Sequence, residues 1–321
     1  MSACTWSGQS GINPSDDLLD FLRRLPDMDI DAYLEAASKP LPECFRINTL
    51  KLPEERVKNL LKDRGWSFVK IPWARFGYRL MSGPESGLGR SMEHMLGLIY
   101  VQGPVSMLPA EVLEPKPGTA VLDLCASPGS KSTQLAQLMN NEGILVCNDI
   151  SATRIKPLVA NLQRCGVINV IIVQSDGRLF RNWCKEQFDN VLVDAPCSSL
   201  GILSKDWSAA NRYSEKLSRR ISRLQQSLLI SAYDCLKPGG LLVYSTCTIH
   251  PLENEWVVTH LLDERSDAKL LPVSGNGLKS RKPLEEWAGV KFSSEIKNCF
   301  KCYPHDNDAE GFFIAKIKKE M

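Results

Sequence analysis

The sequence predicts an α/β fold, in which helices cover both faces of a parallel sheet and a small α+β unit precedes that sheet. From about residue 96 onward, short apolar runs of strand length alternate with helical segments, as βαβ units require. Before residue 95 this rhythm is absent. A stretch rich in glycine and turn-forming residues, 84–104, separates the two patterns. We therefore expect two units, 1–95 and 96–321.

The N-terminal unit is expected to combine helices with a small sheet. Residues 16–37, "DDLLDFLRRLPDMDIDAYLEAA", have a helical pattern that Pro26 divides into two pieces. A short strand in "CFRINTLK" follows, then a helix that begins near Pro53 and a second strand after Gly65. This order is typical of a small α+β module.

The C-terminal unit carries the regular βα alternation. Strands are expected near 120–124, 143–148, 170–174, 189–194 and 241–246, with a last strand in "GFFIAKIK" that could join the sheet edge. Helices are expected near 130–140, 152–165, 212–236 and 253–263. Because ligands bind beyond the carboxyl ends of the strands in such sheets, the strand ends are where functional residues should be sought.

Composition narrows the class of protein. The 321 residues are 43% hydrophobic, as in ordinary folded domains. The net charge of +2 excludes a protein whose whole surface is strongly positive. A nucleic-acid surface must then be local. Without a signal pattern or an apolar run of about 18 residues, we expect a cytoplasmic protein with no membrane partner, and a monomer. The eleven cysteines are scattered along the chain, which favours reduced thiols over disulfides. Cys299 and Cys302 have the spacing of zinc ligands, but the sequence contains no second pair with this spacing, so no metal site is expected.

The first strand of the larger sheet leads into a tight turn. "TAVLDLCASPGSK" closes its strand at Asp123, turns at Ser127 to Gly129, and starts a helix that contains Lys131. Backbone N–H groups in such a turn can meet an anionic or polar part of a ligand. The turn has neither the spacing of a phosphate-binding P-loop nor the three glycines of the dinucleotide fingerprint.

Acids end the next three strands. Asp149 is placed to accept hydrogen bonds from ribose hydroxyls, although it could also be a mere neighbour of a helix cap, and Asp176 suits an adenine amino group. Arg154 stands in a first helical turn, where a cation is unfavourable, which suggests an acidic partner. Asp194 ends the fourth strand. These acids predict a nucleoside cofactor, and the absence of recognisable hydride-transfer or phosphate-gripping motifs favours S-adenosylmethionine.

Two strand ends carry thiols, Cys197 in "VDAPCSS" and Cys247 in "YSTCTIHPLENE". Carbon 5 of a pyrimidine is barely nucleophilic until a thiolate adds to carbon 6 and turns the ring into an enamine. Asp194 is placed to hydrogen-bond to the ring as negative charge develops. One thiol would attack, and the other would assist release or remove the carbon-5 proton. Glu253 and Glu255 are interpreted as first-turn helix acids rather than catalysts.

Together these motifs resemble the RNA cytosine-5 methyltransferases of the RsmB, RsmF and NSUN family over residues 40–317. The resemblance implies a Rossmann-like S-adenosylmethionine-dependent methyltransferase sheet and an RRM-like N-terminal module, with RNA, either rRNA or tRNA, as substrate. It assigns Cys247 as the nucleophile and Cys197 as the thiol of product release, with Asp194 and Lys131 at the target base. The implied cofactor contacts are Cys125, Ala126, Ser127, Pro128, Gly129, Ser130, Lys131, Asp149, Arg154, Asp176 and Asp194. The RRM-like module would place Arg46 on RNA phosphates.

Two functions of other kinds stay open. One is DNA cytosine-5 methylation, in which Cys197 would attack; the Thr-Cys motif and the RNA-type N-terminal module count against it. The other is an inactive RNA-binding or assembly factor that keeps the fold. The two intact thiols count against that interpretation.

Overall fold

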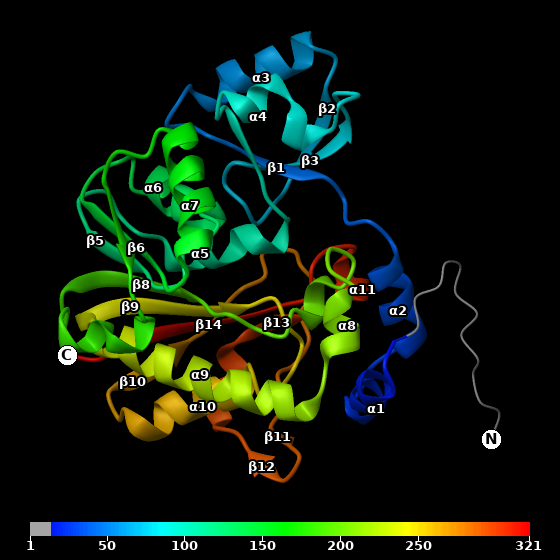
Figure 1. The fold of residues 1–321 in the computed structure, drawn as a ribbon, viewed down its shortest axis with the longest axis vertical. Coiled ribbons are helices and arrows are strands. Elements are labelled where there is room, and N and C mark those ends of the chain that lie inside the picture. The colour runs from blue at the N-terminus through cyan, green and yellow to red at the C-terminus, as the bar shows by residue number, and fades with distance from the viewer. Residues whose placement is uncertain (1–13) are drawn as a thin grey trace.

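The parallel sheet predicted from the alternating pattern is the largest of three sheets in the computed structural model, which describes residues 14–321 (Figure 1). Its strands run in the order β10-β14-β9-β8-β5-β6-β7. The parallel strands are β5 (Ala120–Asp123), β6 (Ile144–Asp149), β7 (Val170–Gln174), β8 (Phe188–Asp194) and β9 (Leu236–Thr246). The predicted strands are thus confirmed.

The last predicted strand is also present, as β14 (Phe312–Lys319). It pairs antiparallel with β9 and is flanked on its other side by β10 (Ala268–Leu271), with β13 (Phe300–Cys302) also paired to it. It therefore lies inside the sheet rather than at the edge. A further hairpin joins β11 (Glu286–Trp287) to β12 (Val290–Lys291).

Side chains that alternate along the strands divide the core into two layers. In β8, Val191 and Val193 pack with α9 (Glu215–Asp234) and α10 (Glu255–Glu264), whereas Leu192 points to the opposite layer. That opposite layer is covered by α5 (Leu108–Leu113), α6 (Ser130–Leu138) and α7 (Ala152–Cys165). Both faces are buried, which explains why the strand sequences are continuous apolar runs.

The strand order reverses beside β5. From β5 the chain proceeds outward through β6 to β7, and it then crosses to β8 on the other side of β5. The carboxyl ends of β5 and β8 therefore diverge into loops that leave a crevice between them, the usual ligand position in such sheets.

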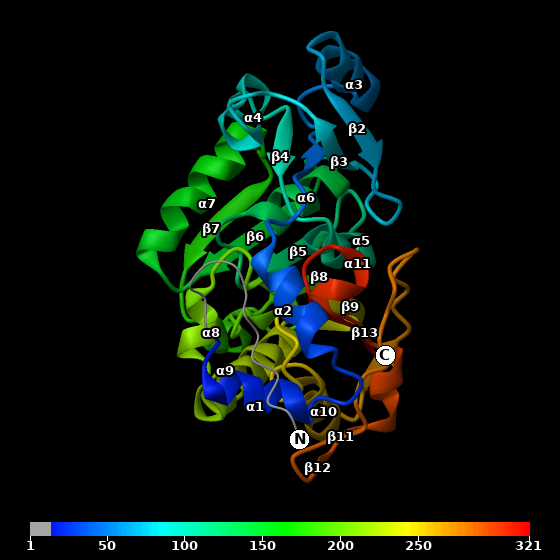
Figure 2. The ribbon, with the colours of Figure 1, turned by 90° about the vertical axis from the view of Figure 1, so that its right-hand side faces the viewer.

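The small sheet has the order β2-β3-β1-β4 and is antiparallel throughout. Its elements are β1 (Cys44–Ile47), α3 (Glu54–Asp63), β2 (Ser67–Lys70), β3 (Gly77–Ser82), α4 (Met92–Met95) and β4 (Ile99–Val101). This βαββαβ order matches the expected RRM-like module, which lies above the large sheet in Figures 1 and 2. Because β4 belongs to it, the small sheet extends past residue 95.

The first two helices do not pack with the small sheet. Side chains of α1 (Asp16–Arg24) and α2 (Ile30–Ser38) join the core layer of α9 and α10, and the Tyr33 hydroxyl donates to the Leu200 carbonyl at 2.6 Å. Figure 2 shows both helices beside α8 (Ser208–Arg212) and α9, away from the small module. The N-terminal segment thus contributes to both parts of the molecule.

Arg46 occupies a different position from the one expected of a phosphate contact. Only 1% of Arg46 is exposed, and its guanidinium donates to Gln102 Oε1 at 3.3 Å, to Thr133 Oγ1 at 2.8 Å and to Gln137 Oε1. Because successive strand residues face opposite sides, Phe45 packs on α3 while Arg46 faces α6. The prediction that Arg46 contacts RNA is wrong, since this sheet face is buried against the catalytic sheet domain.

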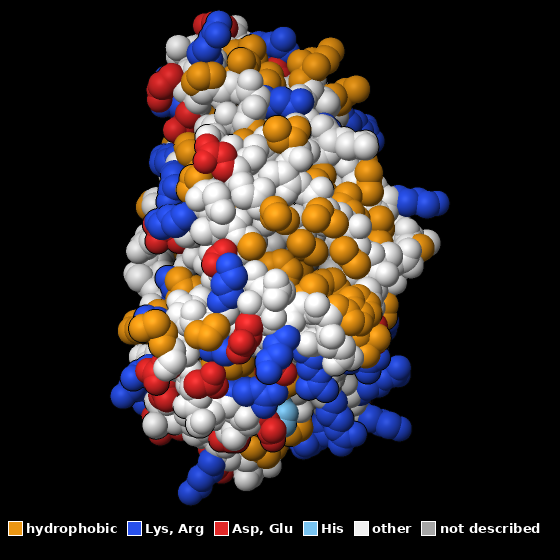
Figure 3. All heavy atoms as spheres, turned by 90° about the vertical axis from the view of Figure 1, so that its left-hand side faces the viewer, with side chains coloured by type: hydrophobic (Ala, Val, Ile, Leu, Met, Phe, Trp, Pro, Cys, Tyr) orange, Lys and Arg blue, Asp and Glu red, His pale blue; other side chains and the backbone are white. Residues whose placement is uncertain are grey.

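The exposed surface is mixed in character. Figure 3 shows hydrophobic side chains across the middle of one side of the molecule and Lys and Arg, interspersed with acids, mainly below them. Ile144, Ile168 and Ile171, on or near the edge strand β7 and its neighbour β6, are at least half exposed. Among residues 14–321, no helix is long and apolar enough to cross a membrane.

We predict that Arg46→Leu lowers the free energy of unfolding by about 2–5 kcal/mol, because three buried acceptors lose their donor. Urea denaturation followed by circular dichroism would measure the loss. Arg56→Leu, on the exposed side of the same module, is the control and should change stability by no more than about 0.5 kcal/mol. Full stability of Arg46→Leu combined with weaker RNA binding would contradict the buried role.

Candidate active site

A pocket of about 460 Å³ opens at the carboxyl ends of β5, β6, β7 and β8, where the strand order reverses. Of the residues predicted from the sequence, the lining includes Cys125, Ser127, Asp149, Arg154, Asp176, Asp194, Cys197 and Cys247. Its remaining lining residues are Leu124, Asn148, Ile150, Gly177, Ala195, Pro196, Ser199, Leu224 and Leu228. The volume falls in the range of pockets for small ligands and cofactors.

The turn after β5 shapes one wall without exposing all of its residues. Ala126, Pro128, Gly129, Ser130 and Lys131 do not line the pocket, although all five were predicted to contact the cofactor. Gly129 has φ of 104°, a conformation that favours glycine, and it leads directly into α6. Within this turn, only Cys125 and Ser127 therefore line the pocket, and the other residues set the path of the backbone between β5 and α6.

Asp149 is buried at the tip of β6 and keeps one oxygen available to the pocket. Its Oδ1 accepts the Ser151 N–H at 2.9 Å, and its Oδ2 lies 3.6 Å from Arg154 Nη2. Arg154 in turn donates to the Ser127 carbonyl at 2.9 Å. The acidic partner expected for Arg154 is thus Asp149, and the arginine joins the strand tip to the turn after β5.

Asp176 is tied to its own loop. The Arg178 guanidinium donates to both carboxylate oxygens of Asp176, at 2.6 Å and 3.0 Å, and this hydrogen bonding lowers the pKa of Asp176. An ionised acid at this rim can accept from a ligand amino group. Asn148, which sequence reasoning missed, orders the same wall, because its amide bridges the Leu124 carbonyl and the Ser175 N–H.

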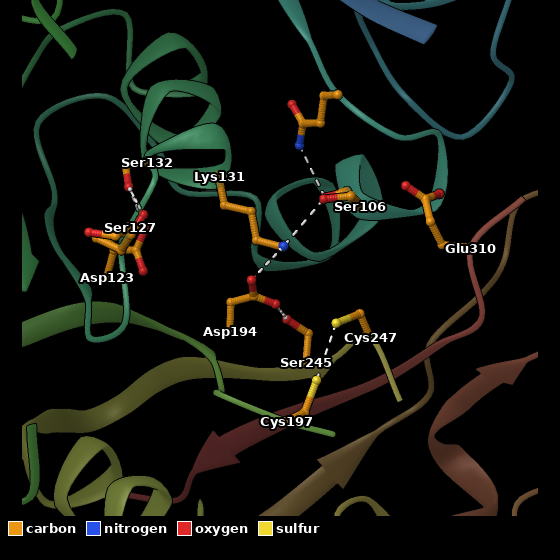
Figure 4. Close-up of polar contacts among 12 residues, drawn as sticks. Ser106, Asp123, Ser127, Lys131, Ser132, Asp194, Cys197, Ser245, Cys247 and Glu310 are labelled. Atoms are coloured by element: carbon orange, nitrogen blue, oxygen red, sulfur yellow. Dashed lines mark hydrogen bonds and ion pairs between the residues drawn. The ribbon is translucent and has the colours of Figure 1, made fainter. Parts of the chain in front are cut away.

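Asp194 is the centre of a polar network (Figure 4). Its Oδ2 accepts from Lys131 Nζ at 2.7 Å and its Oδ1 accepts from Ser245 Oγ at 2.8 Å. Lys131 also reaches Ser106 Oγ at 3.3 Å, although the lysine side chain is only 6% exposed. Ser106 and Ser245 were not predicted; Ser245 stands two residues before Cys247 in the same motif, which was the available signal.

The two thiols predicted from separate strand ends lie side by side. Cys197 Sγ is 3.2 Å from Cys247 Sγ, a distance at which one thiol hydrogen is shared (Figure 4). Hydrogen bonding from Cys197 lowers the pKa of Cys247, and the same contact raises the pKa of Cys197 well above its usual range. The pair therefore favours a Cys247 thiolate next to a protonated Cys197.

The surroundings of the pair act on Cys247 in both directions. Burial and the Asp194 carboxylate raise the pKa of Cys247, whereas the Ser199 hydroxyl, 3.8 Å from the sulfur, and the Lys131 ammonium lower it. Glu253 raises the pKa of Cys197. Cys125, a third thiol in the pocket, has its pKa raised by burial and lacks such partners, so it is a poor nucleophile.

Asp123 lies beneath the pocket and is nearly inaccessible. Its Oδ2 accepts from Ser132 Oγ at 2.7 Å, while Oδ1 has no partner among the described residues, and burial raises the pKa of this carboxyl to about 7. Asp123 therefore holds its proton to a higher pH than an exposed aspartate does.

Cys299 and Cys302, the closely spaced cysteines of the sequence, do not line the pocket. Cys299 and Cys302 are buried, burial raises the pKa of both thiols, and Cys302 Sγ lies 3.5 Å from the Glu310 carbonyl. Within residues 14–321, no group of three or more His, Cys, Asp or Glu side chains is arranged to hold a metal ion.

Two family models match most of the chain. A family model described as 16S rRNA methyltransferase RsmB/F matches residues 110–318, and the N-terminal domain of 16S rRNA methyltransferase RsmF matches residues 16–104. The chain belongs to the RsmB/F methyltransferase family. The resemblance inferred from the Pro-Cys and Thr-Cys motifs is confirmed.

Relatives within the RsmB/F family differ in how much of their length is matched. A tRNA (cytosine(49)-C(5))-methyltransferase of Pyrococcus abyssi is 44% identical over 88% of this chain and 89% of its own length. Ribosomal RNA small subunit methyltransferase F of Vibrio campbellii is 40% identical over 91% of this chain, which spans only 60% of that relative.

Solved structures agree with the fold of this RsmB/F member. A methyltransferase homolog from Pyrococcus horikoshii, 37% identical, superposes with a TM-score of 0.80 and covers 95% of this chain and 99% of its own. NSun6 from Pyrococcus horikoshii with SFG, at 23% identity, covers 96% of this chain and 98% of its own with a TM-score of 0.82, and it supports the fold alone. The predicted fold class is confirmed.

We predict that mild peroxide joins Cys197 to Cys247, because their sulfurs are close enough to form the roughly 2.05 Å bond after a small movement. The two thiols would lose two hydrogens while one peroxide is reduced to two waters. Intact mass should fall by the mass of two hydrogens and recover with dithiothreitol. Cys197→Ser should block the change; an unchanged wild-type mass would contradict the prediction.

We also predict that Asp123→Asn gains stability relative to the wild type as pH rises from 5 to 8. A carboxyl whose folded pKa is raised from 3.8 to about 7 holds its proton longer when folded, so wild-type stability falls across that interval. The relative gain should be about 2–4 kcal/mol in urea titrations at the two pH values. Asp189→Asn is the control. Because the pKa of Asp189 is lowered, the stability difference between this variant and the wild type should not change from pH 5 to 8.

Proposed function

We propose that this chain methylates carbon 5 of cytosine in RNA, using S-adenosylmethionine and a covalent cysteine adduct at carbon 6. The observation that supports this most directly is the 3.2 Å contact between Cys197 and Cys247 in the pocket that Asp149 and Asp194 also line. Membership of the RsmB/F family supports the same reaction class. The two alternatives, a DNA methyltransferase and an inactive assembly factor, become outcomes of the tests below.

The residues around the pocket fit the proposed cofactor. Asp149 would hold the ribose hydroxyls with its carboxylate, Asp176 would accept from the adenine amino group, and the turn at Cys125 and Ser127 would hold the methionine part. When bound, S-adenosylmethionine supplies an electrophilic methyl group on its sulfonium. Leu224 and Leu228 supply apolar surface for a flat ring.

The first chemical step belongs to Cys247. Its thiolate would add to carbon 6 of the cytosine, forming a C–S bond and moving the ring electrons toward nitrogen 3 and the carbonyl oxygen. The Lys131–Asp194 pair lies beside that position and would supply a proton or a hydrogen bond to the developing negative charge. Carbon 5 then carries the electron pair that takes the methyl group.

The second step restores the aromatic ring. A base must remove the hydrogen of carbon 5, and the electrons of that C–H bond expel the Cys247 sulfur from carbon 6. Cys197 is the group nearest to Cys247 and would serve in this release, either as the base once it has lost its proton or by protonating the departing thiolate. Only one cysteine therefore forms the bond to the base.

We infer tRNA as the substrate class to test first. The tRNA methyltransferase of Pyrococcus abyssi has the higher identity of the two relatives, and the match extends over 89% of its length, compared with 60% for the rRNA enzyme of Vibrio campbellii. Incorporation of labelled methyl groups would be measured with unmodified transcripts of tRNA and 16S rRNA, and with DNA of the same sequences. The nucleic acid that accepts the label would identify the substrate class. Bisulfite sequencing of the product would locate the cytosine.

We predict that Cys247→Ala abolishes methylation and loses covalent capture of RNA containing 5-azacytidine, because no thiolate remains to add to carbon 6. Cys197→Ala should retain capture and accumulate a complex resistant to SDS, because release is stalled. Gel electrophoresis of labelled RNA measures both. Capture by Cys247→Ala and not by Cys197→Ala would reverse the two roles, as in DNA-type enzymes; no methylation by the wild type on any transcript would favour the assembly factor.

A further inference from the structure

Glu253 is a buried acid that the proposed reaction does not use. It stands in the loop between the end of β9, which leads into Cys247, and the start of α10 at Glu255. The interpretation of Glu253 as a first-turn helix acid is wrong, since it precedes the helix. Glu255 does begin α10, but it is buried in an ion pair with Lys301 Nζ at 2.8 Å.

The carboxyl of Glu253 connects the loops that carry the two thiols. Its Oε2 accepts the backbone N–H of Ser198, the residue after Cys197, at 2.8 Å. Its own backbone carbonyl accepts from the Tyr244 hydroxyl at 2.6 Å, which fixes it to the strand before Cys247. A second link, Ser198 Oγ to Thr248 Oγ1 at 2.8 Å, joins the same two loops.

Three buried polar atoms around Glu253 have no hydrogen-bond partner among the described residues. They are Glu253 Oε1, Gln225 Oε1 and Ser218 Oγ, and none of these residues has exposed surface. Burial raises the pKa of this carboxyl above its usual value, whereas hydrogen bonding from Ser218 and Gln225, which lie close to it, lowers the pKa. No cation among residues 14–321 forms an ion pair with Glu253, in contrast to Glu255 and Lys301.

Counting donors shows what is missing. One N–H of the Gln225 amide donates to the Pro196 carbonyl at 2.9 Å, and the amide nitrogen has a second N–H. That second N–H and the Ser218 hydroxyl are the donors near the carboxyl, and hydrogen bonding from both lowers its pKa. The acceptor that they lack is Glu253 Oε1, which would hold Gln225 and, through Gln225, Pro196.

We propose that Glu253 is a positioning residue, whose carboxyl accepts from the Ser198 N–H and from the Gln225 amide and so holds Cys197 for product release. Ser198 is then fixed on one side of Cys197 through Glu253, and Pro196 on the other side through Gln225. The thiol that must act after methyl transfer is thereby held against Cys247. This inference rests on the proposed function of the two thiols.

The experiment compares Glu253→Gln with Glu253→Ala in the full chain. The side-chain carbonyl of glutamine can still accept from the Ser198 N–H, so Glu253→Gln should keep turnover within about threefold of the wild type. Glu253→Ala should slow turnover by roughly 10–100-fold while adduct formation changes less than about threefold, because Cys197 is misplaced and Cys247 is not. Methyl incorporation into a tRNA transcript gives turnover, and the SDS-resistant complex with that transcript reports the adduct.

Further variants separate positioning from general damage. Gln225→Met, which removes the amide and the link to Pro196, should accumulate the adduct as Glu253→Ala does, and it keeps the test decisive if the alanine variant does not fold. Thr259→Val is the matched control, since it also deprives a backbone N–H, that of Ser293, of a buried acceptor at 3.1 Å, but far along α10. It should lower the melting temperature without accumulating adduct.

The outcomes are distinguishable from those of the proposed function itself. If the wild type captures and methylates RNA but folded Glu253→Gln is inactive, Glu253 does more than hold the loop of Cys197 and the proposal is wrong. Equal turnover of Glu253→Ala and the wild type, or an equal loss of adduct formation and release, would also overturn it. Failure of the wild type to form any adduct instead contradicts the proposed function.

Discussion

The parallel pairing of β8 with β9 is the constraint on which the candidate site depends. Asp194 at the end of β8 is in register with Ser245 near the end of β9, so the loops that follow start side by side. Cys197 and Cys247 come a few residues later in those loops and meet at 3.2 Å. A change of register by one residue would turn the inward side chains of a strand to the other face. The buried side chains of β8 and β9, which pack in both core layers, hold this register.

Around this register the acids are divided by environment. Asp194 and Asp149 each lie next to a cation, Lys131 or Arg154, and face the pocket. Asp123 and Glu253 lie behind it, without such partners in the described chain, and burial raises the pKa of both. Ion-paired acids thus face the pocket, whereas buried acids without an ion pair lie behind it. The proposed methyl donor, which is positively charged, would lie on the side of the ion-paired acids.

The small module shows how a familiar topology serves a different purpose. Its βαββαβ order is that of an RNA-binding sheet, yet the face that carries Arg46 is closed by α6 of the larger sheet. The amides of Gln102 and Gln137 satisfy that guanidinium, and burial lowers the pKa of Arg46 to about 10. The module is consequently attached through its sheet, and any RNA it contacts must use its remaining surfaces.

The sequence by itself determined the βα alternation, the strand ends and the candidate reactive side chains, because hydrophobic period and turn residues are local properties. "VDAPCSS" and "YSTCTIHPLENE" were sufficient to select Cys197 and Cys247. Only the tertiary structure decided which side chains meet, since that depends on strand order and register. It placed Lys131 on Asp194, turned Arg46 inward, left Pro128 and Ser130 out of the pocket lining, and set Glu253 beneath the loop of Cys197. Burial and the partners of a charge come from contacts between distant segments, and no local pattern records them.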